Sequence, residues 1–164
     1  MPALQKQPLP ETALSGRCPI RILAENDKQA ALNYLSARPI STVIMAGWIH
    51  ERGIVSEANR GTFYGYFDND GRLDGVALIG RATMFETQNE RALQEFAELA
   101  QSCETVGMVM GEEEKMEVML RHFVSSNRKP RLLYHDLLYE FNGTTRLAHG
   151  IEGLHAERVK IWNK

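Results

Sequence analysis

The segment from Gly61 to Ile79 restricts the fold of this chain more than any other part of the sequence. Within 61–67, one alternating set of positions holds Phe63, Gly65 and Phe67, and the other holds Thr62, Tyr64 and Tyr66. Asp68-Asn69-Asp70-Gly71 follows, and an apolar stretch runs from Leu73 to Ile79. Alternation with period two is typical of a β-strand, and the Asp- and Gly-rich segment favours the positive φ angles of a tight turn. The segment therefore predicts a β-hairpin, so the fold must contain a sheet.

Helical and extended patterns are mixed along the rest of the chain. We expect a strand at 20–22, a helix running towards Ala37 that Pro39 ends, and a second helix capped by Ser41 that ends at Gly53. After the hairpin we expect a strand at 82–86, a helix at 88–102, a buried strand at 105–110, a helix from 112 to about 124, and a long last strand at 131–141. Because a helix connects the strands at 82–86 and 105–110, these two are predicted to be parallel. The order predicts the α/β class, with an α+β mixed sheet.

Two of the predicted helices carry clear apolar stripes. Thr87 and Glu90 form a Thr-x-x-Glu pattern, which predicts a capping box at the start of the first of them. The residues expected to face the core are Leu93, Phe96, Leu99 and Ala100 on this helix and Met116, Met119, Leu120 and Phe123 on the next. Both helices are therefore predicted to cover the sheet.

The chain of 164 residues suits one domain, and its two ends differ in composition from the middle. Residues 1–19 contain four prolines and few apolar residues, which predicts a flexible N-terminal arm. Residues 20–141 form the predicted domain. The tail at 142–164 has little core material, but four apolar residues could share one face of a short helix that links to a further domain: Ile151, Leu154, Val159 and Trp162.

Composition and spacing exclude several classes of protein. A formal charge of −2 argues against a nucleic-acid partner, because such binding needs a strongly basic surface. The most apolar stretch, Val43 to Ile49, is far shorter than the roughly 20 residues of a membrane span. Cys18 and Cys103 form no CxxC pair, and the five histidines have no ligand spacing, so we expect no metal and a cytoplasmic location.

The order of elements, together with the residues of the hairpin, resembles a known family. Two short helices, three antiparallel strands and then helix, strand, helix and strand are similar to the GNAT superfamily of acyl-CoA-dependent N-acetyltransferases. The stretches GTFYGYF at 61–67 and GRLDGVALIG at 71–80 resemble the N-terminal half of bacterial proteins that carry two GNAT-like halves in tandem. The resemblance covers roughly residues 20–141.

This resemblance implies a place for acetyl-CoA, whose pyrophosphate the family holds with backbone amides of an Arg/Gln-x-x-Gly-x-Gly/Ala loop. The loop position here comprises Thr87, Gln88, Asn89, Glu90 and Arg91. Gln88 matches the first position of the motif, but Arg91 and Leu93 stand where glycines are expected, and Glu90 adds a negative charge. We therefore expect no tight binding of acetyl-CoA.

The resemblance also implies a general acid, often a tyrosine near the later helix, and the predicted helix from 112 to 124 contains none. His122 is the titratable group near neutrality on that helix, at its far end. Glu86 at the end of a predicted strand is a carboxylate that could deprotonate a substrate amine. These two residues are the candidate catalytic groups.

Three hypotheses follow for the function. The chain is the degenerate first half of a tandem acetyltransferase and supports a catalytic second half. Alternatively, it is an acyl-CoA-dependent N-acyltransferase that acts alone on a small amine, or a binding or dimerisation module without chemistry. The expected partner is a second GNAT-like domain or another protomer.

Overall fold

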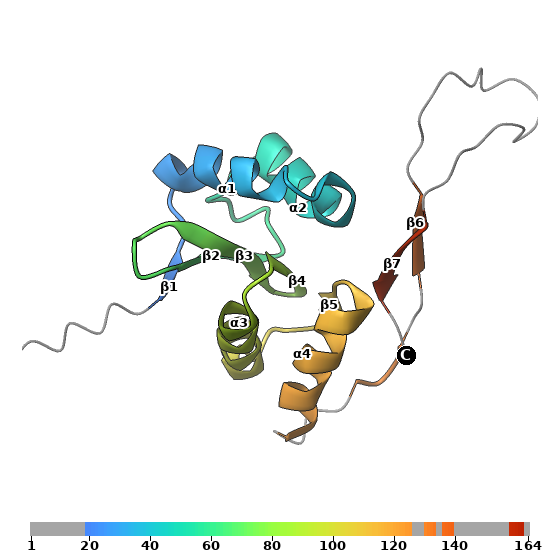
Figure 1. Ribbon diagram of the computed structural model, residues 1–164. Coiled ribbons are helices and arrows are strands. Elements are labelled where there is room, and N and C mark those ends of the chain that lie inside the picture. The colour runs from blue at the N-terminus through green and yellow to red at the C-terminus, as the bar shows by residue number, and fades with distance from the viewer. Residues whose placement is uncertain (1–18, 126–129, 134–135, 140–157, 163–164) are drawn as a thin grey trace, which may run out of the picture.

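Helices cover both faces of a five-stranded sheet (Figure 1). The computed structural model describes residues 19–125, 130–133, 136–139 and 158–162. Helices α1 and α2 lie on one face of the sheet, whereas α3 and α4 lie on the other. The predicted α/β class with a mixed sheet is confirmed.

The strands follow one another across the sheet in chain order. They are β1 (Ile20–Ile22), β2 (Gly61–Phe67), β3 (Leu73–Gly80), β4 (Ala82–Thr87) and β5 (Met108–Met110). Neighbours are antiparallel except β4 and β5, which are parallel as predicted. The prediction of a buried strand at 105–110 was wrong in extent and burial, because β5 has three residues and Met108 is 41% exposed. Strands at a sheet edge are often short in this way.

The predicted hairpin of β2 and β3 is confirmed, with its turn at the expected residues. The Asp68 carboxylate accepts hydrogen bonds from the backbone amides of Asp70 and Arg72 at 2.9 and 2.8 Å. Gly71 has a φ of 79°, which a glycine adopts without strain. Side-chain and backbone chemistry of the turn therefore act together to reverse the chain.

Within the residues that the structure describes, five helical segments lie between the strands. They are the 3-10 turn η1 (Glu25–Asp27) and the helices α1 (Lys28–Leu35), α2 (Pro39–Arg52), α3 (Glu90–Ser102) and α4 (Glu113–Ser125). Pro39 is the first residue of α2, a position where its missing amide costs nothing. The expected cap at Ser41 was wrong, because the cap position is Arg38 and the Ser41 hydroxyl donates to the Arg38 carbonyl. Gly53 ends α2 with a φ of 86°, as predicted.

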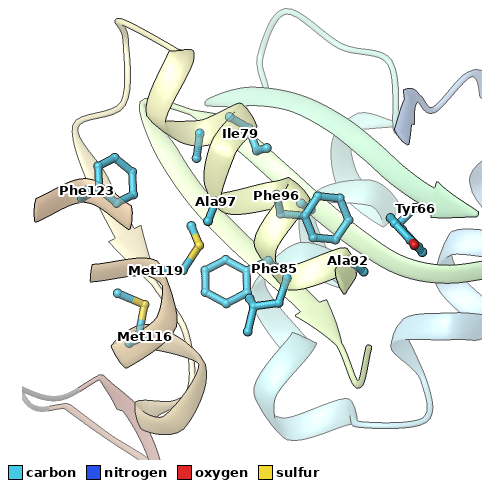
Figure 2. Close-up of a cluster of buried hydrophobic side chains, with 12 residues drawn as sticks. Tyr66, Ile79, Phe85, Ala92, Phe96, Ala97, Met116, Met119 and Phe123 are labelled. Atoms are coloured by element: carbon cyan, nitrogen blue, oxygen red, sulfur yellow. The ribbon is translucent and has the colours of Figure 1, made fainter. Parts of the chain in front are cut away.

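Two apolar clusters hold the layers together. On the α1–α2 face, Phe63, Leu78 and Met84 from the sheet belong to one buried cluster with Leu35 and Ile49 from the helices. Figure 2 shows the other cluster, which lies between the sheet and α3–α4 and includes Tyr66, Ile79, Phe85, Phe96, Met116, Met119 and Phe123. The predicted inward faces of α3 and α4 are therefore confirmed, with Leu99 and Leu120 partly buried at the margin.

The last two strands form a separate two-stranded antiparallel sheet. They are β6 (Asp136–Tyr139) and β7 (Arg158–Trp162). The predicted long strand at 131–141 was therefore wrong: β6 has four residues and pairs with β7 instead of with the main sheet. Val159 and Trp162 were expected on a helix but lie in β7, where basic and apolar residues alternate from residue 158 to 161 with the period of a strand. Ile151 and Leu154 lie outside the described residues.

Most of the predicted N-terminal arm also lies outside the described residues. Pro19 is the exception, and its carbonyl oxygen accepts a hydrogen bond from the Phe67 amide at 2.7 Å. Residue 19 is therefore already tied to the sheet, just before β1 begins.

Candidate functional site

The parallel strands β4 and β5 separate after a short stretch of pairing. The pairs are Ala82 with Met108, Thr83 with Val109, and Met84 with Met110, where β5 ends. β4 continues to Thr87, while the chain after β5 turns at Gly111 towards α4. The separation leaves a gap beside the end of β4, on the side where α2 and α4 begin.

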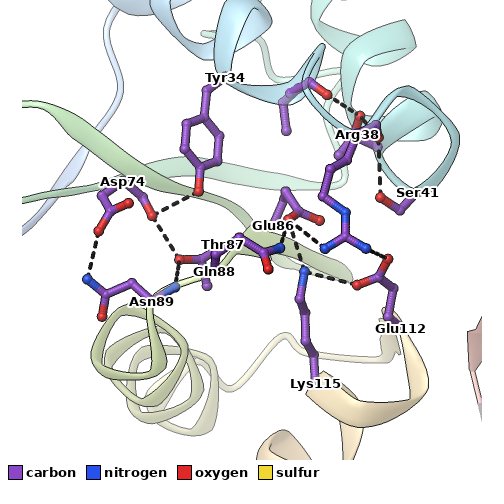
Figure 3. A network of polar contacts seen from close by, with 12 residues as sticks. Tyr34, Arg38, Ser41, Asp74, Glu86, Thr87, Gln88, Asn89, Glu112 and Lys115 are labelled. Carbon is purple, nitrogen blue, oxygen red and sulfur yellow. Dashed lines mark hydrogen bonds and ion pairs between the residues drawn. The ribbon is translucent and has the colours of Figure 1, made fainter.

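Four charged side chains lie in this gap, and we call them the charge cluster: Arg38, Glu86, Glu112 and Lys115 (Figure 3). Lys115 Nζ lies 2.9 Å from Glu86 Oε1 and 3.0 Å from Glu112 Oε2. Arg38 forms an ion pair with Glu112, and its Nη1 lies 3.8 Å from Glu86 Oε1. Each cation therefore bridges both carboxylates.

The cluster is buried at its centre and balanced in charge. The Glu86 side chain is 4% exposed and that of Lys115 is 12% exposed. Burying a carboxylate is costly unless cations and hydrogen-bond donors replace its water, and here two cations face two carboxylates. The Gln88 amide adds a third contact to Glu86 Oε1 at 3.1 Å. A substrate amine at that oxygen would have to displace Lys115 or Gln88.

The loop between β4 and α3 is fixed by hydrogen bonds to β3. The Thr87 hydroxyl donates to the Asp74 carbonyl at 2.8 Å, and the Asn89 side-chain amide donates to the Asp74 carboxylate at 2.7 Å. The Tyr34 hydroxyl also donates to the Asp74 carbonyl, at 2.9 Å. Burial raises the pKa of Tyr34 above its ordinary value, so the phenol stays a donor at neutral pH.

Asn89 caps helix α3, and the predicted capping box of Thr87 and Glu90 was wrong. Asn89 Oδ1 accepts hydrogen bonds from the amides of Arg91 and Ala92 at 2.9 and 3.2 Å. Thr87 instead accepts a bond from the Asn89 amide with its hydroxyl oxygen. Both residue types suit a cap, but Asp74 holds Thr87 away from the helix and orients Asn89 towards it.

The residues of the loop do not fit the pyrophosphate of acetyl-CoA. Two amides at the start of α3 already donate to Asn89, and Gln88 points back to Glu86. Leu93, at a glycine position of the motif, is buried in the apolar cluster. Arg91 is exposed, and its guanidinium lies 3.9 Å from the Glu95 carboxylate, one turn further along α3. An anion here would therefore find two of the first amides of α3 already taken, and the Arg91 guanidinium turned along the helix towards Glu95.

The two candidate catalytic residues lie in different places. Glu86 is at the centre of the charge cluster, whereas His122 follows Lys115 by seven residues, about 10 Å further along α4. The backbone carbonyl of His122 accepts hydrogen bonds from Gln101 and Ser125. Since Glu86 and His122 are so far apart, they do not form one acid–base pair.

Sequence reasoning missed the cations of the cluster and the role of Asp74. Glu112 and Lys115 are three residues apart at the start of a helix, a spacing that predicts an ion pair. No local signal connects Arg38 with Glu112, which lie 74 residues apart. The contacts of Asp74 with Asn89 and Tyr34 are equally distant in the sequence.

Neither a metal centre nor a membrane helix is found in the part of the chain that the structure describes. Within it, no three His, Cys, Asp or Glu residues gather closely enough to hold a metal ion. Its helices are also too short or too polar to cross a bilayer.

Comparisons with known proteins give one structural likeness. No protein-family model matches the chain, and no curated protein matches it. It is similar to the solved structure of a mutant spermidine N-acetyltransferase from Vibrio cholerae, with a TM-score of 0.43 and 11% sequence identity. The match covers 87% of this chain and 90% of that chain.

Proposed function

We propose that this chain is a GNAT-like domain that does not bind acetyl-CoA by itself and supports a second, catalytic GNAT-like domain. The main support is the cap of helix α3, where Asn89 Oδ1 takes the amides of Arg91 and Ala92. In the superfamily that the sequence resembles, amides at this position hold the pyrophosphate. A loop whose own side chain occupies two of these amides has less to offer an anion.

The charge cluster in the gap between β4 and β5 also supports this proposal. A thioester arm that followed β4 would enter the gap beyond Met84, where Lys115 and Arg38 bridge the carboxylates. Displacing them would leave Glu86 buried without its cations, which is strongly unfavourable. Binding of acetyl-CoA would therefore be disfavoured twice. Its acyl end would have to displace the cations from Glu86, and its pyrophosphate would find fewer free amides.

Calorimetric titration with acetyl-CoA at moderate salt tests the first part of the proposal. We expect no measurable heat up to millimolar ligand, because the loss of even two charge-assisted hydrogen bonds weakens binding about 100-fold or more. Micromolar one-to-one binding that disappears in Gln88→Ala would overturn it. Arg91→Ala is the matched control, since its side chain points away from the loop.

The supporting role needs a separate test. We expect a GNAT-like domain that carries a glycine-rich acyl-CoA loop to form a one-to-one complex with this chain in native mass spectrometry. Acetyl transfer to a small amine by the isolated chain would instead favour an independent acyltransferase. In that case Glu86→Gln should abolish turnover.

A further inference from the structure

We infer that the end of the gap under α2 is a binding pocket for a small uncharged molecule with one N–H or O–H donor and a short apolar body. The pocket is lined by Ile40, Ser41, Ile44, Met110 and Glu86, among others. The inference goes beyond the proposed function, because it needs neither acetyl-CoA nor a partner domain.

An open carboxylate oxygen at the pocket is the first observation. The contacts of Glu86 with Lys115, Gln88 and Arg38 all involve Oε1. None of the residues that the structure describes donates a hydrogen bond to Oε2, and Figure 3 shows this second oxygen without a dashed line. Glu86 is 3% exposed and lines the pocket, so its unpartnered oxygen can be reached from there. A carboxylate can accept about four hydrogen bonds, and one left open in a buried place favours a donor.

The charges around Glu86 select an uncharged donor. The cluster already balances two cations with two carboxylates, and the positive end of the α4 dipole lies beside it. An additional ammonium group would be repelled by Lys115 and Arg38, which both approach the same carboxylate. A carboxylate ligand would be repelled by Glu86 and Glu112. An amide or hydroxyl group donates to Oε2 without either penalty.

The shape and lining of the pocket define the rest of the ligand. Its cavity volume of about 20 Å³ can hold a single small polar group, since one water needs roughly 10–15 Å³. Ile40, Ile44 and Met110 line the walls, and Val43, which is 50% exposed, extends the apolar surface outward along α2. A donor group can therefore bind beside Glu86 while a chain of a few carbons lies against α2.

Nuclear magnetic resonance with four matched probes tests this inference. The full chain, with labelled Ile and Met methyl groups, is titrated with butyramide, n-butylammonium, butyrate and 2-pentanone, which have similar apolar bodies. We expect saturable shifts of Ile40, Ile44 and Met110 with butyramide. Binding of the other three should be at least tenfold weaker, because two are charged and the ketone has no donor. Stronger binding of the ammonium, equal binding of the ketone, or no shifts with butyramide would overturn the inference.

Two surface variants locate the binding. Val43→Trp covers the mouth of the pocket and should weaken butyramide binding at least tenfold. Val55→Trp is the control, because Val55 is 62% exposed and does not line the pocket. Equal binding by both variants would contradict the assignment. Titration of each variant with acetyl-CoA keeps this result separate from the proposed function.

Discussion

The hairpin of β2 and β3 and the gap between β4 and β5 are held together by different forces. In the hairpin, seven pairs of residues match across the strands, and Phe63 and Leu78 are buried among apolar neighbours. Beside the gap, only three residues of β4 pair with three of β5, and charged side chains occupy the space beyond them. Apolar packing acts wherever enough surface is buried, whereas a buried charge cluster depends on every partner being present. The two regions should therefore respond differently to substitution, pH and salt.

Truncation in the hairpin should have the largest effect on stability. Phe63 is 1% exposed in β2, so Phe63→Ala removes a large apolar side chain and leaves a cavity. We expect a loss of about 3–5 kcal/mol in the free energy of unfolding, measured by urea denaturation. Val55→Ala, at an exposed position, should change it by less than about 0.5 kcal/mol. Equal losses would show that Phe63 does not pack as described.

Removal of one cation should test the mutual dependence of the charge cluster. In Lys115→Met the side chain keeps its length, but Glu86 loses a hydrogen bond from an ammonium group. We expect a loss of about 1.5–3 kcal/mol, since Arg38 and Gln88 remain as partners. Lys28→Met is the control, because Lys28 makes a long, exposed contact with Glu25.

A double variant separates the ion pair from simple packing. If Glu86 and Lys115 depend on each other, Glu86→Gln combined with Lys115→Met should cost less than the sum of the two single changes. If the two single losses in unfolding free energy add up to the loss of the double variant, Glu86 and Lys115 act independently. That result would contradict the mutual dependence of the charge cluster.

The cap of α3 should contribute less than the cluster beside it. Asn89→Ala removes the acceptor for two helix amides and the contact with Asp74. We expect a loss of about 0.5–2 kcal/mol and faster amide exchange in the first turn of α3. Gln94→Ala on the exposed side of the same helix should leave exchange in that turn unchanged.

The smallest effect is expected at the exposed ion pair beside the hairpin. The hydrogen bond from the Arg21 guanidinium holds the pKa of Asp27 below its usual value, despite some desolvation. The folded state therefore binds this proton less readily, so the contribution is present above the unfolded pKa of about 4 and is lost as pH falls through the folded value.

Acid titration of stability measures this contribution. We expect Asp27→Asn to remove no more than about 1 kcal/mol at neutral pH, with the difference from wild type vanishing in acid and shrinking in high salt. A difference that grows as the pH falls would have the wrong sign. The buried cluster should be much less sensitive to salt than this pair.

Local patterns in the sequence determined most of the fold within residues 20–125. The alternation at 61–67, the turn at Gly71 and the stripes on α3 and α4 predict strands, a hairpin and inward faces, because each depends on neighbours a few residues apart. The parallel pairing of β4 and β5 also followed, since a connecting helix returns the chain in the same direction. Among the loop residues, the sequence indicated the missing glycines at Arg91 and Leu93 without help from the structure.

The tertiary structure alone decided how the candidate site is built. Asp74 orients Asn89 to cap α3, and Arg38 reaches Glu112, yet these partners are 15 and 74 residues apart in the chain. The pairing of β6 with β7 likewise joins segments that no local pattern connects. Polar contacts of this kind depend on the position and direction of individual atoms, whereas a sequence pattern specifies only which face of an element is apolar. For that reason the residues of the loop could be named from the sequence, but the cap and the charge cluster could not.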